Sequence, residues 1–135
     1  MNNVPLLLLV EDESLICMTL VAILEDGGFR VITAQDGAAA IAEIESEAGL
    51  AGIITDIRLG GDADGWDVAR HARHRHPQIA VVYMTGDSAA DWSAEGVPNS
   101  LMLQKPFASA QLLSAVSTLL NSVDTSLSPP AASDE

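Results

Sequence analysis

The stretch Gly52-Ile53-Ile54-Thr55-Asp56-Ile57-Arg58 decides the fold, because its apolar run ends abruptly in a carboxylate. A short apolar run between a glycine and a polar loop is typical of a buried strand in a parallel sheet, which helices cover on both faces. Asp56 would then lie at the carboxyl end of that strand, where open α/β sheets bind their ligands. For Asp56 alone, a simple cap of the following loop is an equally good interpretation.

The composition limits the kind of partner that this chain can bind. Its 135 residues include 19 acidic and 6 basic side chains, for a formal net charge of -13. Such a balance argues against nucleic acid and anionic membranes as partners, and it favours divalent cations or basic protein surfaces. The single cysteine, Cys17, excludes an internal disulfide and is expected to be a buried, inert thiol. Without a signal peptide or a run of ~20 apolar residues, a cytoplasmic protein is expected.

Strand-like and helical patterns alternate along the chain, which predicts an α/β fold with a doubly wound parallel sheet. The strand-like runs are Pro5 to Val10, Phe29 to Ala34, the run that ends at Asp56, Ile79 to Met84 and Ser100 to Leu103. Helical patterns start at Ser14, a possible cap, and at Asp36-Gly37, Trp66, Ser88 and before Leu112. In the second helix the residues expected to face inward are Ile41, Ala42, Ile44 and Ala48. Residues 1–122 should form one domain and residues 123–135 a flexible tail.

Polar residues follow four of the predicted strands. They are Glu11, Asp12 and Glu13 after the first, Asp56 at the end of the third, Thr85 after the fourth and Lys105 after the fifth. Strands of a parallel sheet end at one edge, so these side chains should converge. Two carboxylates about 5 Å apart repel by roughly 3 kcal/mol at an effective dielectric near 20. A divalent ion with oxygen ligands, such as Mg²⁺, would offset that repulsion. A carboxylate beside Mg²⁺ could attack phosphorus, with Thr85 and Lys105 holding the phosphoryl oxygens.

Four motifs together resemble the receiver domain of two-component response regulators. They are Leu9-Val10-Glu11-Asp12-Glu13, Ile54-Thr55-Asp56-Ile57-Arg58, Met84-Thr85-Gly86 and Gln104-Lys105-Pro106-Phe107. The resemblance covers residues 4 to 122 and implies the flavodoxin-like strand order 2-1-3-4-5. It also implies that Asp56 accepts a phosphoryl group from a sensor histidine kinase or a histidine phosphotransfer protein.

The same resemblance implies a role for each residue at the predicted site. Glu11, Asp12 and Asp56 would bind Mg²⁺ through their side chains, and Arg58 through its backbone carbonyl. Thr85 and Lys105 would contact the phosphoryl group, and Lys105-Pro106 would be a cis peptide. Such a domain is not an enzyme in the usual sense, because it catalyses only its own phosphorylation and dephosphorylation. The fourth helix, fifth strand and fifth helix, with Trp92 and Met102, would bind an unknown downstream protein or a second copy of the chain.

The chain departs from the family pattern at three places. The loop Leu59 to Gly65 lacks the usual proline and is one residue longer. Met102 replaces the usual aromatic residue three positions before Lys105, so a flexible Met rotamer would have to serve in the switch. Arg58 and Asp87 flank the site, and we expect them to pair across it and to gate the attacking water.

Other interpretations of the same residues lead to different classes of protein. A receiver-shaped binding module could act without phosphorylation, and the chain could also be the receiver fragment of a hybrid histidine kinase. A Mg²⁺-dependent aspartyl phosphatase would need a second aspartate two residues after Asp56, where Arg58 stands. His71 and His74 could face the same side of a helix, but a solvated surface is favoured there because no third metal ligand is placed.

Overall fold

The computed structural model describes residues 4–86 and 95–127, with the backbone alone for 122–127. A five-stranded parallel sheet in the order β2-β1-β3-β4-β5 forms its centre, as the sequence predicted. The strands are β1 (Leu6–Val10), β2 (Arg30–Ala34), β3 (Leu50–Asp56), β4 (Ala80–Thr85) and β5 (Ser100–Gln104). The described helices are α1 (Ser14–Asp26), α2 (Gly37–Ser46), α3 (Gly65–Arg75) and α5 (Ser109–Leu127).

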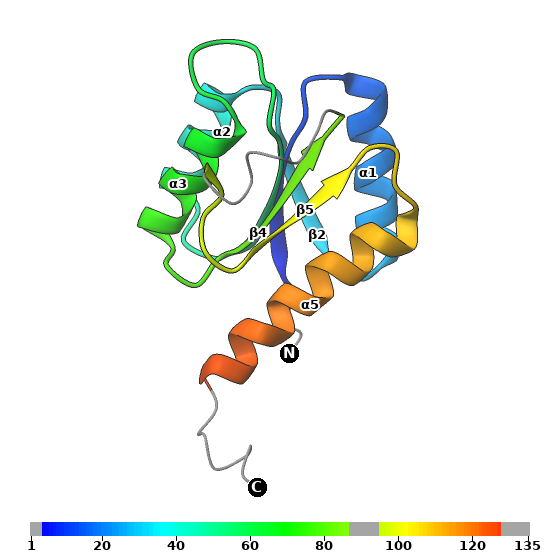
Figure 1. Cartoon of the computed structure of the whole chain (residues 1–135), viewed down its shortest axis with the longest axis vertical. Helices are drawn as coiled ribbons and strands as arrows, with labels where there is room; N and C mark the ends of the chain where they lie inside the picture. Colours follow the sequence, from blue (N-terminus) through cyan, green and yellow to red (C-terminus); the bar gives the residue numbers. More distant parts are fainter. Residues whose placement is uncertain (1–3, 87–94, 128–135) are drawn as a thin grey trace, which may run out of the picture.

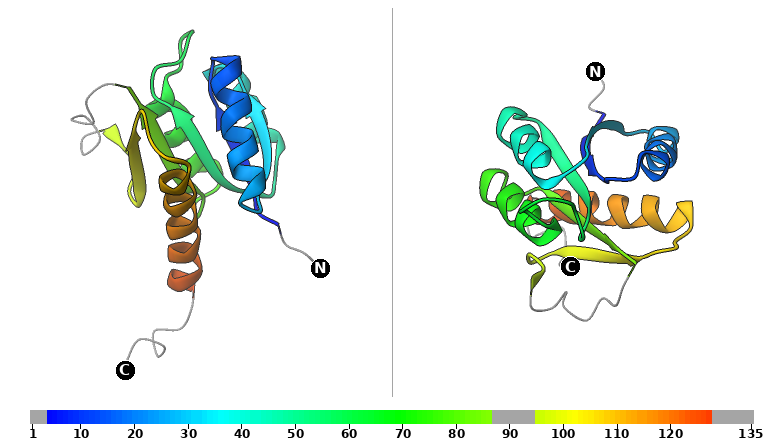
Figure 2. Two further views of the ribbon diagram at one scale, coloured as in Figure 1. Left: turned by 90° about the vertical axis from the view of Figure 1, so that its right-hand side faces the viewer. Right: turned by 90° about the horizontal axis from the view of Figure 1, so that it is seen from above.

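Helices cover both faces of the sheet, with α2 and α3 on one side and α1 and α5 on the other (Figure 1). The layered arrangement is also visible from above and from the side (Figure 2). Because successive side chains of a strand point to opposite faces, β1 supplies Leu8 and Val10 to one core and Leu7 and Leu9 to the other. The sheet is therefore buried on both faces, which explains why its strands read as continuous apolar runs.

Capping residues and glycines mark the ends of α1 and α2. The side chain of Asp36 caps α2 by accepting a hydrogen bond from the backbone N–H of Ala39 at 2.8 Å. Gly27 ends α1, and Gly28 follows with a φ of 98°, a conformation that glycine adopts without strain. Ser14, the possible cap of α1, is instead its first helical residue. The N-cap is Glu13, and its side chain makes no capping hydrogen bond.

Three expectations about burial and helix length are corrected. In α2, Ala40 and Ile44 are buried while Ala42 and Ala48 are exposed. The reason is that a 3.6-residue period through Ile44 selects Ala40, whereas Ala48 lies beyond the end of the helix. Helix α5 continues to Leu127, past the expected domain boundary at residue 122. The flexibility predicted for residues 128–135 concerns a segment outside the described residues.

Cys17 of α1 is partly buried rather than fully buried as expected. It lines a groove of about 520 Å³ between α1 and β2. Burial, and secondarily the negative charge of Glu11, raises the pKa of its thiol, which agrees with an unreactive cysteine. In the same helix the apolar side chains of Leu15 and Met18 are exposed to solvent.

The carboxyl ends of all five strands lie at one edge of the sheet, at the top of Figure 1. The loops that follow β1, β3, β4 and β5 all start there. Among the described residues, no helix is long and apolar enough to cross a membrane. The predicted helix at Ser88 to Glu95 falls almost entirely outside the described residues.

Candidate functional site

Three carboxylates meet at the carboxyl edge of the sheet. Glu11 and Asp12 follow β1, and Asp56 is the last residue of β3. Each offers an oxygen that lies within 4.8 Å of the oxygens of the other two. Glu11 is 1% exposed and Asp56 9% exposed, whereas Asp12 is open to solvent. The edge therefore has two buried acids and one exposed acid that could share a cation.

Backbone hydrogen bonds fix Glu11 in this position. Its own N–H donates to the carbonyl of Ala34 at 3.1 Å, which extends the pairing of β1 with β2 by one residue. Its carboxylate accepts a hydrogen bond from the backbone N–H of Glu13 at 3.1 Å. The Glu13 side chain is exposed and is not part of the acidic group. Of the three acids after β1, the first two therefore belong to the site and the third is the N-cap residue of α1.

Lys105 is the cation of the site. Its Nζ donates to Oδ2 of Asp56 at 3.2 Å and to Oε1 of Glu11 at 3.3 Å. The Lys105 backbone N–H donates to the carbonyl of Thr85 at 2.7 Å, which holds the segment after β5 against the end of β4. The Lys105-Pro106 peptide bond is cis, as the family resemblance implied. One ammonium group therefore bridges the two buried carboxylates.

The electrostatics of the site favour a further cation. Burial raises the pKa of Glu11 and of Asp56 above the ordinary carboxyl value, although hydrogen bonds and Lys105 act in the opposite direction. Burial alone would lower the pKa of Lys105, but the attraction of Asp56 and Glu11 outweighs it and raises that pKa. Lys105 is thus held in its charged form, while the carboxylates remain incompletely compensated.

The loop between β3 and α3 returns closely to Asp56. The N–H of Gly65 donates to the carbonyl of Ile57 at 2.8 Å, and any Cβ at position 65 would collide with the backbone of Asp56 and Ile57. The sequence had identified Gly65 only as a loop glycine. Its position directly before a helix and after Asp64, a good N-cap residue, was the available signal for a tighter constraint.

The remaining predicted residues differ in burial, and two of them lie outside the described residues. Thr85 is buried at the end of β4, and Arg58 is exposed just after β3. Met102 is partly buried in β5, where it pairs in register with Tyr83 of β4. Asp87 and Trp92 lie outside the described residues, so the expected Arg58–Asp87 pair stays a prediction.

The histidines of α3 make contacts that do not form a metal site. His71 pairs with Glu45 of α2, and Nε2 of His76 lies 3.0 Å from the carbonyl of Ile44. Among the residues that the structure describes, the acidic group of Glu11, Asp12 and Asp56 is the one set of side chains with metal-binding geometry. The solvated surface that the sequence favoured for His71 and His74 stays a prediction.

Comparison with known proteins identifies the family of the domain that carries this site. The model of the response regulator receiver domain matches residues 7–117. A response regulator receiver protein from Anaeromyxobacter sp. (strain Fw109-5) is 35% identical over 112 residues, which is 82% of this chain and 43% of that protein. The chain spans 13 to 43% of the length of the first curated relatives that it matches.

Solved structures agree with this match over nearly the whole chain. A response regulator receiver protein from Sinorhizobium medicae WSM419 superposes with a TM-score of 0.87 and 43% identity, covering 90% of this chain and 98% of that chain. The receiver domain of the sensor histidine kinase PA1611 from Pseudomonas aeruginosa PAO1, with magnesium in its active site cleft, gives a TM-score of 0.77 and 25% identity, covering 88% of this chain and 99% of that chain. The shared sequence model, the strand order and the acidic edge together make this chain a member of the response regulator receiver domain family of two-component systems.

Proposed function

We propose that this receiver domain accepts a phosphoryl group on Asp56, with Mg²⁺ bound beside it, and thereby switches a protein-binding surface. The observation that carries the proposal is the contact of Lys105 Nζ with both Asp56 and Glu11, next to Asp12. Exposed acidic side chains without a basic partner could lie close together on a surface without any function. A buried acidic cluster with a bridging lysine resembles a prepared site for a ligand that brings both negative oxygens and a metal.

The residues present fit Mg²⁺. Their donors are hard carboxylate oxygens, close enough to share one ion, and burial leaves two of them short of positive charge. Glu11, Asp12 and Asp56 would hold the ion through their side chains, and Arg58 through its backbone carbonyl. When bound, Mg²⁺ would supply electrostatic stabilisation for the oxygens of the phosphoryl group in transfer.

The transfer itself would use Asp56 as the nucleophile. One of its Oδ atoms attacks phosphorus on the phosphohistidine of a sensor kinase or phosphotransfer protein, and the new P–O bond forms as the P–N bond breaks. The electron pair of the broken bond stays on the donor's ring nitrogen, which then takes a proton from solvent. Lys105, held in its charged form, pairs with a phosphoryl oxygen, and the Thr85 hydroxyl donates to another.

Loss of the phosphoryl group closes the cycle. Water attacks phosphorus, the P–O bond to Asp56 breaks, and inorganic phosphate leaves while the carboxylate is regenerated. The domain would therefore catalyse its own phosphorylation and dephosphorylation, without turning over a separate substrate. We place this activity in the cytoplasm, where the phosphodonor proteins of two-component systems present their histidines, and we leave the downstream partner open.

The direct test is chemical modification of Asp56. Intact mass spectrometry should detect one added phosphoryl group when the protein is incubated with Mg²⁺ and a small-molecule phosphodonor, and none without Mg²⁺. Asp56→Asn should abolish the modification, while the matched variant Asp62→Asn, at an exposed aspartate of the neighbouring loop, should retain it. No modification of the parent, or modification that survives Asp56→Asn, would contradict the proposal and favour a binding module that acts without phosphorylation.

A further inference from the structure

Tyr83 lies on β4 between the phosphorylation site and the far end of the sheet. It is fully buried, and it precedes Thr85 by two residues on the same strand. Residues two apart on a strand face the same side, so Tyr83 and Thr85 share a face of the sheet. Met102 of β5 is the register partner of Tyr83 and packs against the same core. A rigid aromatic ring thus stands next to a flexible side chain, directly below Thr85.

The Tyr83 side chain connects two segments that are distant in sequence. Its hydroxyl oxygen accepts a hydrogen bond from the backbone N–H of Val97 at 3.0 Å. Its ring lies against the indole of Trp66, with centroids 4.6 Å apart and planes tilted by 57°. Burial raises the pKa of the phenol, so it stays neutral at physiological pH. Tyr83 therefore joins the start of α3 to the residues before β5.

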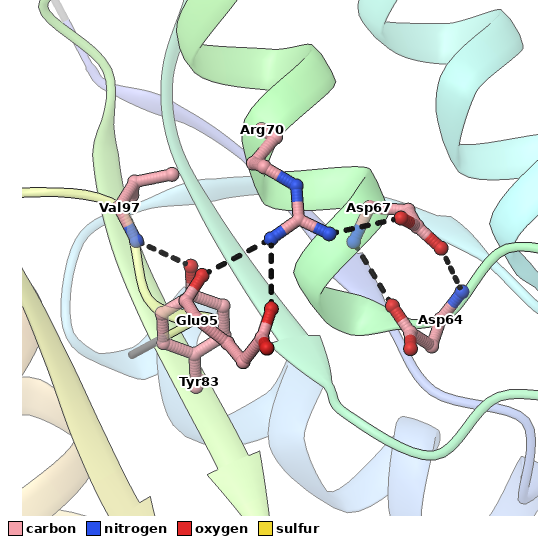
Figure 3. A network of polar contacts seen from close by, with 6 residues as sticks. All are labelled: Asp64, Asp67, Arg70, Tyr83, Glu95 and Val97. Carbon is pink, nitrogen blue, oxygen red and sulfur yellow. Dashed lines mark hydrogen bonds and ion pairs between the residues drawn. The ribbon is translucent and has the colours of Figure 1, made fainter. Parts of the chain in front are cut away.

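Two arginines of α3 hold the same residues before β5. Nη1 of Arg70 donates to the carbonyl of Glu95 at 3.2 Å and pairs with its carboxylate at 3.4 Å. Nη1 of Arg73 donates to the carbonyl of Pro98 at 2.6 Å. Figure 3 shows Arg70 between Glu95 and Asp67, beside the Tyr83–Val97 hydrogen bond. Residues 95–98 are therefore fastened to α3 at both ends and to β4 in the middle, in an arrangement that we call the α3 clamp.

The other end of α3 is fixed next to Asp56. Gly65 packs on the backbone of Asp56, and Asp64 and Asp67 form a capping box in which each side chain accepts the other's backbone N–H. Asp67 also pairs with Arg70 at 3.0 Å. Two connections thus lead from the phosphorylation site to the α3 clamp, one through Thr85 and Tyr83 and the other through Gly65 and α3.

We infer that Tyr83 couples the state of the Asp56 site to the surface formed by α3 and residues 95–98. The inference rests on the proposed phosphorylation of Asp56. A change at the carboxyl end of β4 displaces Tyr83, whose ring can turn against the flexible Met102 but whose hydroxyl is tied to Val97. The displacement alters the Val97 hydrogen bond and the packing on Trp66. The conformational change that starts at Asp56 therefore reaches the α3 clamp.

The test uses the full chain with Mg²⁺ and beryllofluoride, and ¹⁹F NMR to measure loading independently. In the parent, loading should change the hydrogen exchange rate of the Val97 amide by about fivefold or more, because it alters one buried hydrogen bond. In a Trp92→Phe background, loading should also shift the emission of Trp66. Tyr83→Phe keeps the ring but removes the acceptor, so it should load normally and lose most of the loading-dependent change at Val97.

A matched pair of arginine variants checks the route. Arg70→Gln removes the contact with Glu95 and should reduce the response of residues 95–98, while Arg75→Gln, whose side chain faces Glu45 of α2, should leave it intact. Loading without any change at Val97, or an unchanged response in Tyr83→Phe, would overturn the inference alone. Absence of a bound ¹⁹F signal in the parent would overturn the proposed function, and the inference with it.

Discussion

The acidic site at the edge of the sheet and the start of α3 combine carboxylates with a basic partner in opposite environments. At the site, the carboxylates of Glu11 and Asp56 are buried and share one lysine, and burial raises the pKa of both. At the start of α3, Asp67 is exposed, and the Asp64 backbone N–H and then Arg70 lower its pKa. The comparison shows that burial decides the effect of a charge on stability: solvated and hydrogen-bonded charges stabilise the fold, while buried charges that are only partly compensated oppose it.

The largest effect should come from removing the cation of the site. Lys105→Met leaves Glu11 and Asp56 buried without a positive neighbour, and the free energy of unfolding without metal should fall by about 2 kcal/mol, a value discounted for the partial exposure of Lys105. Urea unfolding in a chelator measures it. Arg75→Met, at an exposed ion pair, is the control and should cost less than about 0.5 kcal/mol. Equal losses of unfolding free energy in the two variants would contradict the stronger role that we assign to the buried ion pairs of the site than to the exposed pair of Arg75.

Alkaline pH should reveal the effect of the buried Tyr83 phenol on the free energy of unfolding. Because the folded pKa of Tyr83 is raised above 10.0, the unfolded chain releases its proton first as pH rises. Parent stability should then fall by up to about 1.4 kcal/mol per pH unit above that value, until the folded phenol also ionises. Tyr83→Phe lacks this contribution, although it loses about 1 kcal/mol at neutral pH through the Val97 bond. Urea titrations at neutral and alkaline pH should therefore converge for the two proteins, and a constant gap would contradict the buried geometry.

The capping box of α3 should contribute a conventional amount of stability. Asp64→Ala removes the acceptor for the Asp67 N–H, so the free energy of unfolding should fall by about 1 kcal/mol. Asp62→Ala, an exposed aspartate in the same loop, should change it by less than about 0.5 kcal/mol. Denaturant unfolding of both variants compares them. If Asp64→Ala proved stabilising, the acids at the start of α3 would resemble those of the acidic site after all.

The smallest effect has the opposite sign. Without metal, Glu11→Gln removes one buried charge and should raise the free energy of unfolding by up to about 1 kcal/mol, seen as a higher melting temperature. Asp12→Asn should act in the same direction. Mg²⁺ should raise the melting temperature of the parent through linkage, and that of Glu11→Gln less. A metal-free parent as stable as these variants would show that the acids do not destabilise one another.

Much of the fold and the position of the site followed from one regularity of the sequence. Buried strands read as apolar runs, and each run that mattered ended in a polar residue, so parallel geometry brought Glu11, Asp56 and Lys105 to one edge. Such an argument needs only the direction and order of the strands. The metal-binding and phosphoryl-transfer roles of these residues remain predictions, because geometry alone does not test them.

The errors and omissions of the sequence-based predictions concern contacts between residues distant in sequence and the exact ends of helices. Three acids follow β1, and only the folded backbone shows that Glu13 occupies the N-cap position of α1, without a capping hydrogen bond, while Glu11 turns inward. The Tyr83–Val97 hydrogen bond joins residues with no shared motif, so no local pattern announces it. The inward face of α2 was misjudged because its helical period runs through Ala40 and Ile44 rather than Ala42, and because Ala48 lies beyond the end of the helix.

The contact between Gly65 and the backbone of Asp56 limits how this loop can vary. Substitutions at Gly65 would push α3 away from the backbone of Asp56, whereas a Cβ at position 60 would meet open space. The loop can therefore gain or lose residues at its tip while its last residue stays constant. In a mutational library, position 65 should tolerate almost no replacement, while insertions beside Gly60 should survive selection for folding.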